Sequence, residues 1–556
     1  MNQTAATAPS KHAPSASAPT TAPDGPTRSH REVLEAISGL MLGLFVAILS
    51  STVVTTSLPR IISDLGGSQS SFTWVVTASL LATTVSTPIW GKFADLFDRK
   101  SLVQLSLLIF AIGSVLGGLS ESTGFLIFCR AIQGLGAGGL TALVQIVLAD
   151  LISPRERGRY SGILGSVFAL GSAGGPLLGG VVTDSAGWRW NFYIVVPIAA
   201  AAIILLQKTL HLPARPPRKV TIDYLGAALI ASGISLLLIW VRLAGKNFAW
   251  LSTDTALMVG GSILLLALAV IVEMRAKEPI IPLGLFRNRT VVLSVIASAA
   301  IGVTLFGTSV FLSQYMQLAR GKSPTESGLL TLPLVIGSLV ASTVIGQRIS
   351  RTGTWKPYMI VGSFLMLIGI SAMGTLRYDT NFTLLVVYMS LIGLGLGMVM
   401  QNLVLIVQNS VSVRQLGTAS STVAFFRTLG GAIGVSALGA VLGSRVTSLS
   451  NDGLADLGVA STGSSGAIPV LSDLPAPVRV VIESAYGEAV GDIFLVAIPL
   501  AVLTIVMVML LPNRPLGTKS ATEQLAEEET PVTPTDPVYT VPTGTASEIL
   551  RPRGSR

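Results

Sequence analysis

Long apolar runs constrain this chain more than any other feature of its sequence. A helix needs about 20 residues to cross the hydrocarbon core of a bilayer. Runs of that length are centred near residues 46, 83, 110, 136, 171, 201, 233, 263, 301, 337, 366, 394, 431 and 501. Only 12% of the residues are charged, which is roughly half the share found in soluble proteins. The sequence therefore predicts an all-α, multi-pass membrane protein with fourteen transmembrane helices.

Both ends of the chain are polar. Residues 1–36 are rich in Ala, Ser, Thr and Pro, and residues 513–556 in Thr, Pro and Glu, so both segments are expected to be disordered. Arginines and lysines gather in the loops after the even-numbered runs, which predicts that these loops and both termini are cytoplasmic and that the chain lies in the cell membrane. The net charge of +9 follows from this topology, and no aromatic and basic stripe suggests a nucleic acid.

The second half of the chain repeats the first. Adding 259 takes Gly134 to Gly393 and Gly175 to Gly434, and ten such identities occur at this one shift. The shift spans eight helices, and an even number keeps both copies in the same orientation. We therefore expect a disordered tail (1–36), a six-helix bundle (37–212), two inserted helices (222–275), a second six-helix bundle (288–512) with a long extracytoplasmic loop (about 447–490), and a second tail (513–556).

A glycine-rich segment in the fifth run has the most specific spacing in the chain. Gly171, Gly175 and Gly179 form a stripe of small residues along which another membrane helix can approach to backbone contact, while a proline removes one backbone donor. The alternative is a glycine-rich helix that only packs. The segment resembles the fifth-helix antiporter motif of drug exporters in the major facilitator superfamily, at Gly162, Gly171, Gly175, Pro176, Gly179 and Gly180.

The loop after the second run reads GKFADLFDRK and resembles the loop between helices two and three in that superfamily. Asp95 can accept hydrogen bonds from a neighbouring helix N-terminus or pair with an arginine, which would favour closure of the cytoplasmic side. The alternative is that these charges only mark topology. The resemblance implies a gating role for Gly91, Asp95, Arg99 and Lys100.

The fourth run contains an arginine. Arg130, Gln133 and Gly134 resemble the superfamily's fourth-helix motif, which implies a role in transport and proton coupling. A charged side chain in a membrane helix should face a partner or a wet cavity. The alternative is an arginine that snorkels to the outer interface.

Together these segments look like the fourteen-helix drug:proton antiporter group of the superfamily, the EmrB/QacA type, over about residues 37–512. The resemblance implies the major facilitator fold and a monomer that exports amphipathic small molecules in exchange for protons, with no cofactor besides the proton gradient. A central cavity between the halves would bind the substrate. We expect its polar and aromatic lining to include Gln145, Phe306, Gln401, Asn402 and Arg427.

One departure from the group bears on proton coupling. The group usually has an aspartate just before the segment STVVTTSLP, where this chain has Ser50. None of the fourteen runs carries a central acid, so Asp492, at the outer end of the last run, is our further candidate for coupling. A facilitator or a lipid or metabolite exporter of the same fold, without proton antiport, is the alternative.

Other classes of function lack the residues they need. The single cysteine, Cys129, and the three histidines form neither a metal site nor a nucleophile pair. A lipid-modifying enzyme would need an acid/base set near one interface, and a sensor would need a folded accessory domain. We find neither in the sequence.

Overall fold

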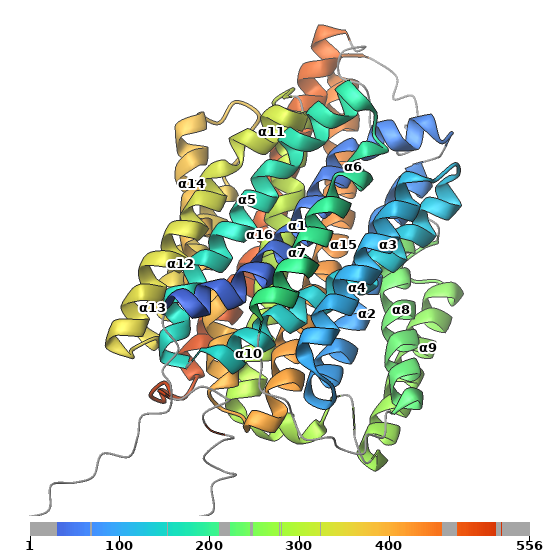
Figure 1. The fold of residues 1–556 in the computed structure, drawn as a ribbon. Coiled ribbons are helices and arrows are strands. Elements are labelled where there is room, and N and C mark those ends of the chain that lie inside the picture. The colour runs from blue at the N-terminus through green and yellow to red at the C-terminus, as the bar shows by residue number, and fades with distance from the viewer. Residues whose placement is uncertain are drawn as a thin grey trace, which may run out of the picture.

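The computed structural model of the chain is a bundle of long helices (Figure 1). It describes residues 30–518, except 67–68, 153, 211–222, 245–247, 277–278, 280, 323 and 459–474, together with residue 524. Most of the two expected tails thus lies outside the described residues. Within the described part the chain is helical, with one isolated β-bridge between Ala244 and Phe248.

In the described part of the chain, seven helices make up the first bundle and ten helical elements the second. The first contains α1 (His30–Asp64), α2 (Gln69–Leu96), α3 (Arg99–Gly118), α4 (Thr123–Leu151), α5 (Pro154–Ala186), α6 (Trp190–Tyr193) and α7 (Val195–Thr209). Between the bundles lie α8 (Tyr224–Leu243) and α9 (Thr253–Arg275). The second contains η1 (Leu283–Arg287), α10 (Arg289–Gln314), η2 (Tyr315–Ala319), α11 (Pro324–Leu330), α12 (Leu332–Thr352), α13 (Lys356–Met373), α14 (Phe382–Gln408), η3 (Val413–Gln415), α15 (Leu416–Asp456) and α16 (Ala476–Leu510).

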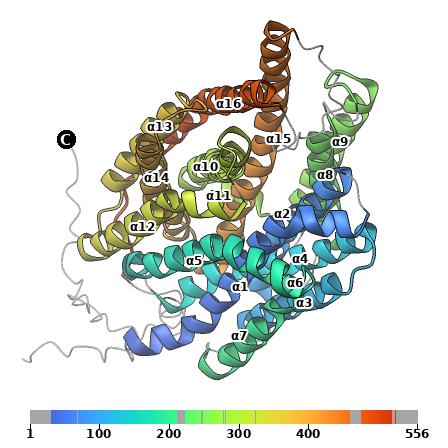
Figure 2. The same cartoon turned by 90° about the horizontal axis from the view of Figure 1, so that it is seen from above.

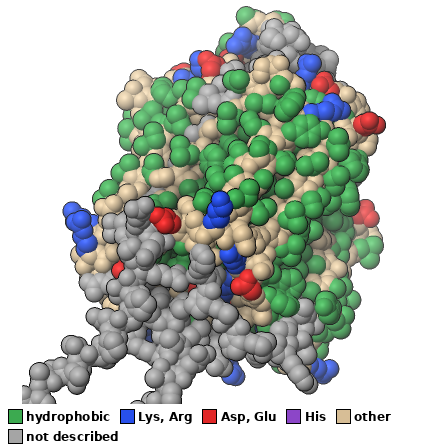
Figure 3. All heavy atoms as spheres, in the orientation of Figure 1, with side chains coloured by type: hydrophobic (Ala, Val, Ile, Leu, Met, Phe, Trp, Pro, Cys, Tyr) green, Lys and Arg blue, Asp and Glu red, His purple; other side chains and the backbone are tan. Residues whose placement is uncertain are grey.

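Eleven helical segments of the described chain are long and apolar enough to cross a membrane. They occupy eleven of the fourteen expected positions, with α6 and α7 together forming one of them. The helices α2, α5 and α8 lie at the other three positions and do not meet the same criterion. The space-filling view shows hydrophobic side chains over much of the flank of the molecule (Figure 3). The all-α architecture is confirmed, and the count of fourteen stays a prediction.

Each bundle has its own hydrophobic core. Leu40, Leu107 and Leu140 are fully buried in the first bundle, where α1, α3 and α4 meet. Met359 and Met366 are fully buried in the second. Seen from above, α1–α7 and α10–α16 form two adjacent groups (Figure 2). The described helices therefore have two separate hydrophobic cores, and the expected division of the chain stays a prediction.

The sequence repeat also holds in three dimensions. A side-chain carbon at Gly134 of α4 would overlap the backbone of Ser79 in α2. At the equivalent Gly393 of α14, it would overlap the backbone of Leu334 in α12. Residues related by the shift of 259 therefore make the same kind of close contact with the corresponding helix of their own bundle.

The two bundles meet along two equivalent helix pairs. In one pair α2 packs against α15, and in the other α5 packs against α12. Small residues lie at both contacts, since Gly91 faces Ser421 and Gly165 faces Ser342. Such contacts allow close approach of helix backbones in a membrane, where apolar lipid removes the hydrophobic drive for association.

The inserted pair α8 and α9 lies outside both bundles, as Figure 2 shows. Ile230, Ile234 and Leu238 of α8 pack against Val85 of α2 and Phe425 of α15. The pair therefore covers one of the two seams between the bundles. On α9, many apolar side chains remain exposed, as expected for a helix that faces lipid.

Three helices extend beyond the boundaries expected from the sequence. The helix α1 begins at His30 instead of residue 37, because Val33 and Ala36 continue its buried face. The loop expected at about 447–490 is helical at both ends. In it, α15 runs to Asp456, shortly before Gly458 with its positive φ, and α16 starts at Ala476, directly before a proline.

Candidate functional site

A cluster of charged groups joins the two bundles at the end where α2 finishes and α15 begins, which we call the basic end. One carboxylate oxygen of Asp95 accepts a hydrogen bond from the backbone N–H of Gly417 at 2.9 Å, and the other from Thr418 at 3.0 Å. The first N–H groups of a helix have no partner within that helix, and the helix dipole favours negative charge there. Asp95 therefore acts as an N-terminal cap supplied by the opposite bundle.

Arg99 holds this carboxylate in place. Its side chain is 2% exposed and donates from Nε to the carbonyl of Ala94 at 2.9 Å. The guanidinium lies 3.7 Å from Asp95 and forms a closer ion pair with Asp150 at the end of α4. A buried charge is stabilised only when it is paired and hydrogen-bonded. We call Asp95, Arg99, Asp150 and the N–H groups of Gly417 and Thr418 the latch.

The other two residues of the expected gate differ in their placement. Gly91 belongs to the latch region, because a side chain there would overlap Ser421 of α15. Lys100 lies apart from α15 and donates from Nζ to the carbonyl of Gln207 at 2.9 Å, near the end of α7. Lys100 thus ties α3 to α7 within the first bundle.

A second layer of hydrogen bonds joins the bundles beneath the latch. Gln145 of α4 donates to the side chain of Gln401 in α14 at 2.9 Å. Gln408 donates to the carbonyl of Gln145 at 3.2 Å and to Ser420 at 2.7 Å. Two of the residues expected to line a substrate cavity, Gln145 and Gln401, are therefore bonded to each other across the interface.

Arg130 is the centre of a polar network inside the first bundle. It is 3% exposed and donates to Gln133, whose amide donates to Ser50 at 3.0 Å and to Ser114 at 2.7 Å. The network links α1, α3 and α4, and a snorkelling side chain does not fit this burial. Among the described residues Arg130 has no ion pair, so its charge is met by a neutral amide. Ser50, which stands where the related group has an acid, is part of this network.

The glycine stripe of α5 packs against α1. Side chains at Gly171, Gly175 and Gly179 would come within 3 Å of atoms of α1, with the tightest contact between Gly175 and Thr52. The approach is close enough for Thr52 Oγ1 to donate to the carbonyl of Gly171 at 3.0 Å and for Ser57 Oγ to donate to Gly179 at 3.2 Å. The stripe thus contacts the helix that carries Ser50.

Of the other three residues of the fifth-helix motif, the structure describes the exposure of one. Gly180 is half-buried beside the stripe. The surroundings of Gly162 and the side chain of Pro176 lie outside what the structure describes. The helix α5 itself continues through Pro176, from Pro154 to Ala186.

The remaining expected site residues belong to the second bundle. Phe306 packs on Gly431 of α15, and Asn402 donates to the carbonyl of Met398 one turn earlier at 2.6 Å. Arg427 of α15 is half-buried, its Nη1 is inaccessible to solvent, and it has no hydrogen bond or ion pair with the described residues.

Asp492 is paired with an arginine, in a different bundle from Arg130. Its Oδ2 lies 2.6 and 2.7 Å from two guanidinium nitrogens of Arg445, a residue of α15. The two side chains are 24% and 44% exposed, respectively. The structure therefore keeps the two expected coupling residues, Arg130 and Asp492, apart.

Asp150, Gly417 and Thr418 are the latch residues that sequence reasoning missed. Asp150 has no acidic equivalent in the second half, because the shift of 259 takes it to Asn409. Gly417 and Thr418 act through backbone N–H groups, which every residue except proline carries. The repeated glycine pair Gly158 and Gly417, near the starts of α5 and α15, is the one signal that could have drawn attention to this position.

The sequence and the fold were compared with those of known proteins. The sequence profile of the Major Facilitator Superfamily matches residues 40–435. The chain belongs to this superfamily. Its members are transporters, so the chain is a multi-pass membrane transporter and not an enzyme.

Named relatives include bacterial drug transporters. The multidrug transporter protein MdtP of Bacillus subtilis (strain 168) is 34% identical over 440 residues, which cover 79% of this chain and 78% of MdtP. Multidrug resistance protein 3 of the same strain is 32% identical over 486 residues, which cover 85% of this chain and 94% of that protein. An MFS-type transporter of Mycobacterium tuberculosis (strain H37Rv) is 36% identical over 514 residues, covering 90% and 73% of the two chains.

Solved structures show the same fold at low identity. The human organic anion transporter MFSD10 superimposes with a TM-score of 0.55 and 16% identity, covering 84% of this chain and 99% of its own. The proton:xylose symporter XylE superimposes with a TM-score of 0.54 and 13% identity, covering 89% and 99%.

The latch makes a prediction about access at the basic end. In a Cys129→Ala background, a cysteine at the fully buried Ala149 should be alkylated about tenfold faster after Asp95→Asn, because hydrogen bonds to a charged group contribute about 1.5–3 kcal/mol. Asp98→Asn is the matched control, since Asp98 caps α3 and does not contact α15. Equal alkylation rates in Asp95→Asn and the parent would show that the latch does not hold this end closed.

The glycine stripe makes a second prediction. Gly175→Leu should abolish transport while the protein still inserts into the membrane, because the new side chain overlaps Thr52 and forces α5 away from α1. Overpacking of this kind costs about 1–3 kcal/mol. Gly443→Leu is the control, since no atom lies within 4 Å of a carbon added there. Transport assays and size-exclusion profiles of both variants check the expectation, and normal transport by Gly175→Leu would contradict it.

Proposed function

We propose that the chain is a secondary active transporter that exports amphipathic small molecules from the cytoplasm in exchange for protons. We place it in the fourteen-helix drug antiporter group, in the cell membrane, with both termini cytoplasmic. The observation that carries the proposal is the latch, in which Asp95 of one half caps α15 of the other. A bond of this kind between duplicated halves can break and re-form without disturbing either core.

The geometry supports a transport cycle of alternating access. The two bundles have separate cores and meet through small residues, so they can rock against each other as rigid bodies. The latch and the layer of Gln145, Gln401 and Gln408 stabilise the state closed at the basic end. Opening that end must break these bonds, and substrate or proton binding would supply the differential free energy.

The names of the relatives support drug export. Two Bacillus subtilis relatives are called a multidrug transporter and a multidrug resistance protein, and a relative from Dothistroma septosporum, 33% identical, is called an efflux pump. We infer a similar range of substrates for this chain. Since one chain contains both halves and their interface, we propose that the monomer is the transporting unit and that it needs no cofactor.

Proton coupling requires a group that titrates during the cycle. We propose Asp492 for this role, because its partner Arg445 lies on α15, the helix that the latch caps at its other end. Movement of α15 relative to α16 would separate the pair and leave the carboxylate without its counter-ion. Arg130 and Gln133, with no acid among their described partners, would position α1 and α4.

A transporter without proton antiport is the second candidate, and Ser50 favours it. In this chain Ser50 joins Arg130 through a neutral glutamine, so the usual first-helix acid is missing from the network. Such a protein would keep the fold and the latch but export its substrate down a gradient.

Inverted membrane vesicles with an acidic lumen distinguish these functions. Addition of a transported amphipathic dye should release protons from wild-type vesicles, whereas Asp492→Asn should lose this release and retain dye counterflow. Asp452→Asn, on the exposed outer turns of α15, is the control. Proton release by Asp492→Asn at the wild-type rate would exclude Asp492 as the coupling acid. Wild-type transport without any proton release would favour the second candidate.

Charge preference makes a further prediction. We expect the wild type to export neutral and anionic dyes better than matched lipophilic cations, because Arg130 and Arg427 lack described acidic partners. Ser50→Asp should raise the ratio of cation to anion efflux about tenfold, equivalent to roughly 1.4 kcal/mol. Ser51→Asp, on an exposed position of α1, is the control. A wild-type preference for cations that Ser50→Asp leaves unchanged would contradict this expectation.

A further inference from the structure

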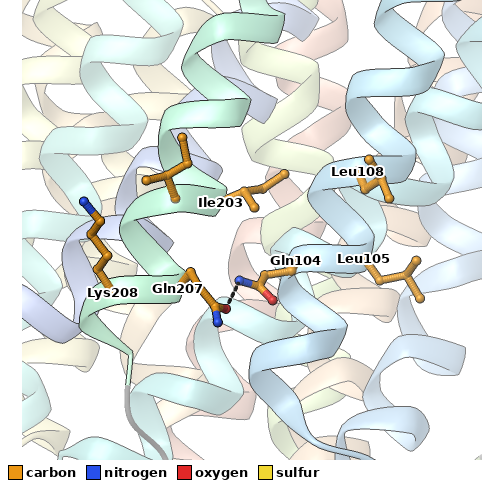
Figure 4. A pocket seen from close by; sticks show the side chains of 7 residues that line it. Gln104, Leu105, Leu108, Ile203, Gln207 and Lys208 are labelled. Carbon is orange, nitrogen blue, oxygen red and sulfur yellow. Dashed lines mark hydrogen bonds between the residues drawn. The ribbon is translucent and has the colours of Figure 1, made fainter.

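An open groove runs between α3 and α7 near the basic end of the first bundle (Figure 4). It has a volume of about 500 Å³ and is lined by Gln104, Leu105, Leu108, Ile203, Ile204, Gln207 and Lys208. Neither the latch nor the interface between the bundles uses this surface. Leu105, Leu108 and Ile204 are 46%, 49% and 57% exposed, so the groove opens on the flank that a membrane would surround.

The polarity of the groove changes along its length. Gln104, Gln207 and Lys208 lie near the helix ends, where α3 begins and α7 finishes. Leu108 lies one turn further along α3, about 6 Å deeper at 1.5 Å per residue. Ile203 and Ile204 lie at the corresponding depth on α7. A phospholipid has the same order, with a polar head at the membrane surface and apolar chains toward the centre.

The polar end has donors for a headgroup. Gln104 Nε2 donates to Gln207 Oε1 at 2.8 Å, which leaves the amide group of Gln207 able to donate to a further acceptor (Figure 4). Lys208 is exposed beside it, and Lys100 is bound to the carbonyl of Gln207. Two cations and an amide donor near the end of α7 complement a phosphate and any additional negative charge on the head.

We propose that this groove binds one anionic phospholipid, with its acyl chain against Leu105, Leu108 and Ile204 and its headgroup at Gln207 and Lys208. An apolar groove at membrane depth is filled by lipid because contact between water and apolar surface is unfavourable. The two lysines select the anionic class. The bound lipid would hold α3 against α7. The existing tie between these helices, the bond from Lys100 to Gln207, lies one residue after Arg99 of the latch.

Native mass spectrometry of the delipidated full-length protein tests the proposal. Titration with phosphatidylglycerol should show one lipid bound more tightly than phosphatidylcholine. Lys208→Gln should weaken the binding of phosphatidylglycerol about fivefold, the effect of one basic side chain near a membrane surface. Leu108→Trp, which fills the groove, should remove that site for both lipids. Arg348→Gln, an exposed arginine of α12 away from the groove, should change nothing.

Three outcomes would overturn the proposal. Equal affinities of the wild type for the two lipids would show that the groove does not select negative charge. Unchanged phosphatidylglycerol binding in both Lys208→Gln and Leu108→Trp would place any bound lipid elsewhere. Displacement of phosphatidylglycerol from the wild type by a transported dye, together with loss of dye transport in Leu108→Trp, would assign the groove to substrate.

Discussion

Close contact between helix backbones is the constraint on which the rest of this structure depends. In a bilayer, every backbone polar group must be satisfied within the helices, and apolar side chains gain little by leaving lipid for protein. The helices are therefore held by dispersion contacts and short hydrogen bonds, which need small residues. Gly134 against Ser79, its equivalent Gly393 against Leu334, and Gly175 against Thr52 are such contacts. The bond from Thr52 to the carbonyl of Gly171 exists only because no side chain separates the helices.

The latch depends on the same close approach. Asp95 reaches the first N–H groups of α15 because Gly91, one turn before it, brings α2 close to α15. The pairing of Arg99 with Asp150 then fixes the direction of the carboxylate from within its own bundle. In the proposed transport cycle, this arrangement separates the part of the site that stays rigid from the part that changes, because the ion pair stays within one bundle while the hydrogen bonds to α15 cross the interface. Alternating access requires such a division.

The sequence predicted the latch and the stripe in part. The four-residue spacing of Gly171 and Gly175 predicts close packing against another helix. It does not identify α1 as that helix, because the backbone of any helix could make the contact. The acid in GKFADLFDRK predicted either a helix N-terminus or an arginine as partner, but Gly417 offers no side chain to mark the helix. Gln145 and Gln401 were expected to line a cavity because they are polar and lie within the membrane. The same polarity lets the two side chains form a hydrogen bond with each other. Periodicity within one helix cannot show whether a polar side chain faces a cavity or a side chain of another helix.

Five charged side chains considered for the site fall into two kinds. Asp95, Asp150 and Asp492 all have arginine partners, so their charges are compensated in the described state. Arg130 donates a hydrogen bond to a neutral glutamine, and Arg427 has no hydrogen bond or ion pair with the described residues. An uncompensated cation in a medium of low dielectric constant stabilises any negative group that comes near it. The positive charges of Arg130 and Arg427 are therefore the basis of our proposal that the substrate brings negative charge or polarisable electron density, whereas Asp95 and Asp150 belong to the latch.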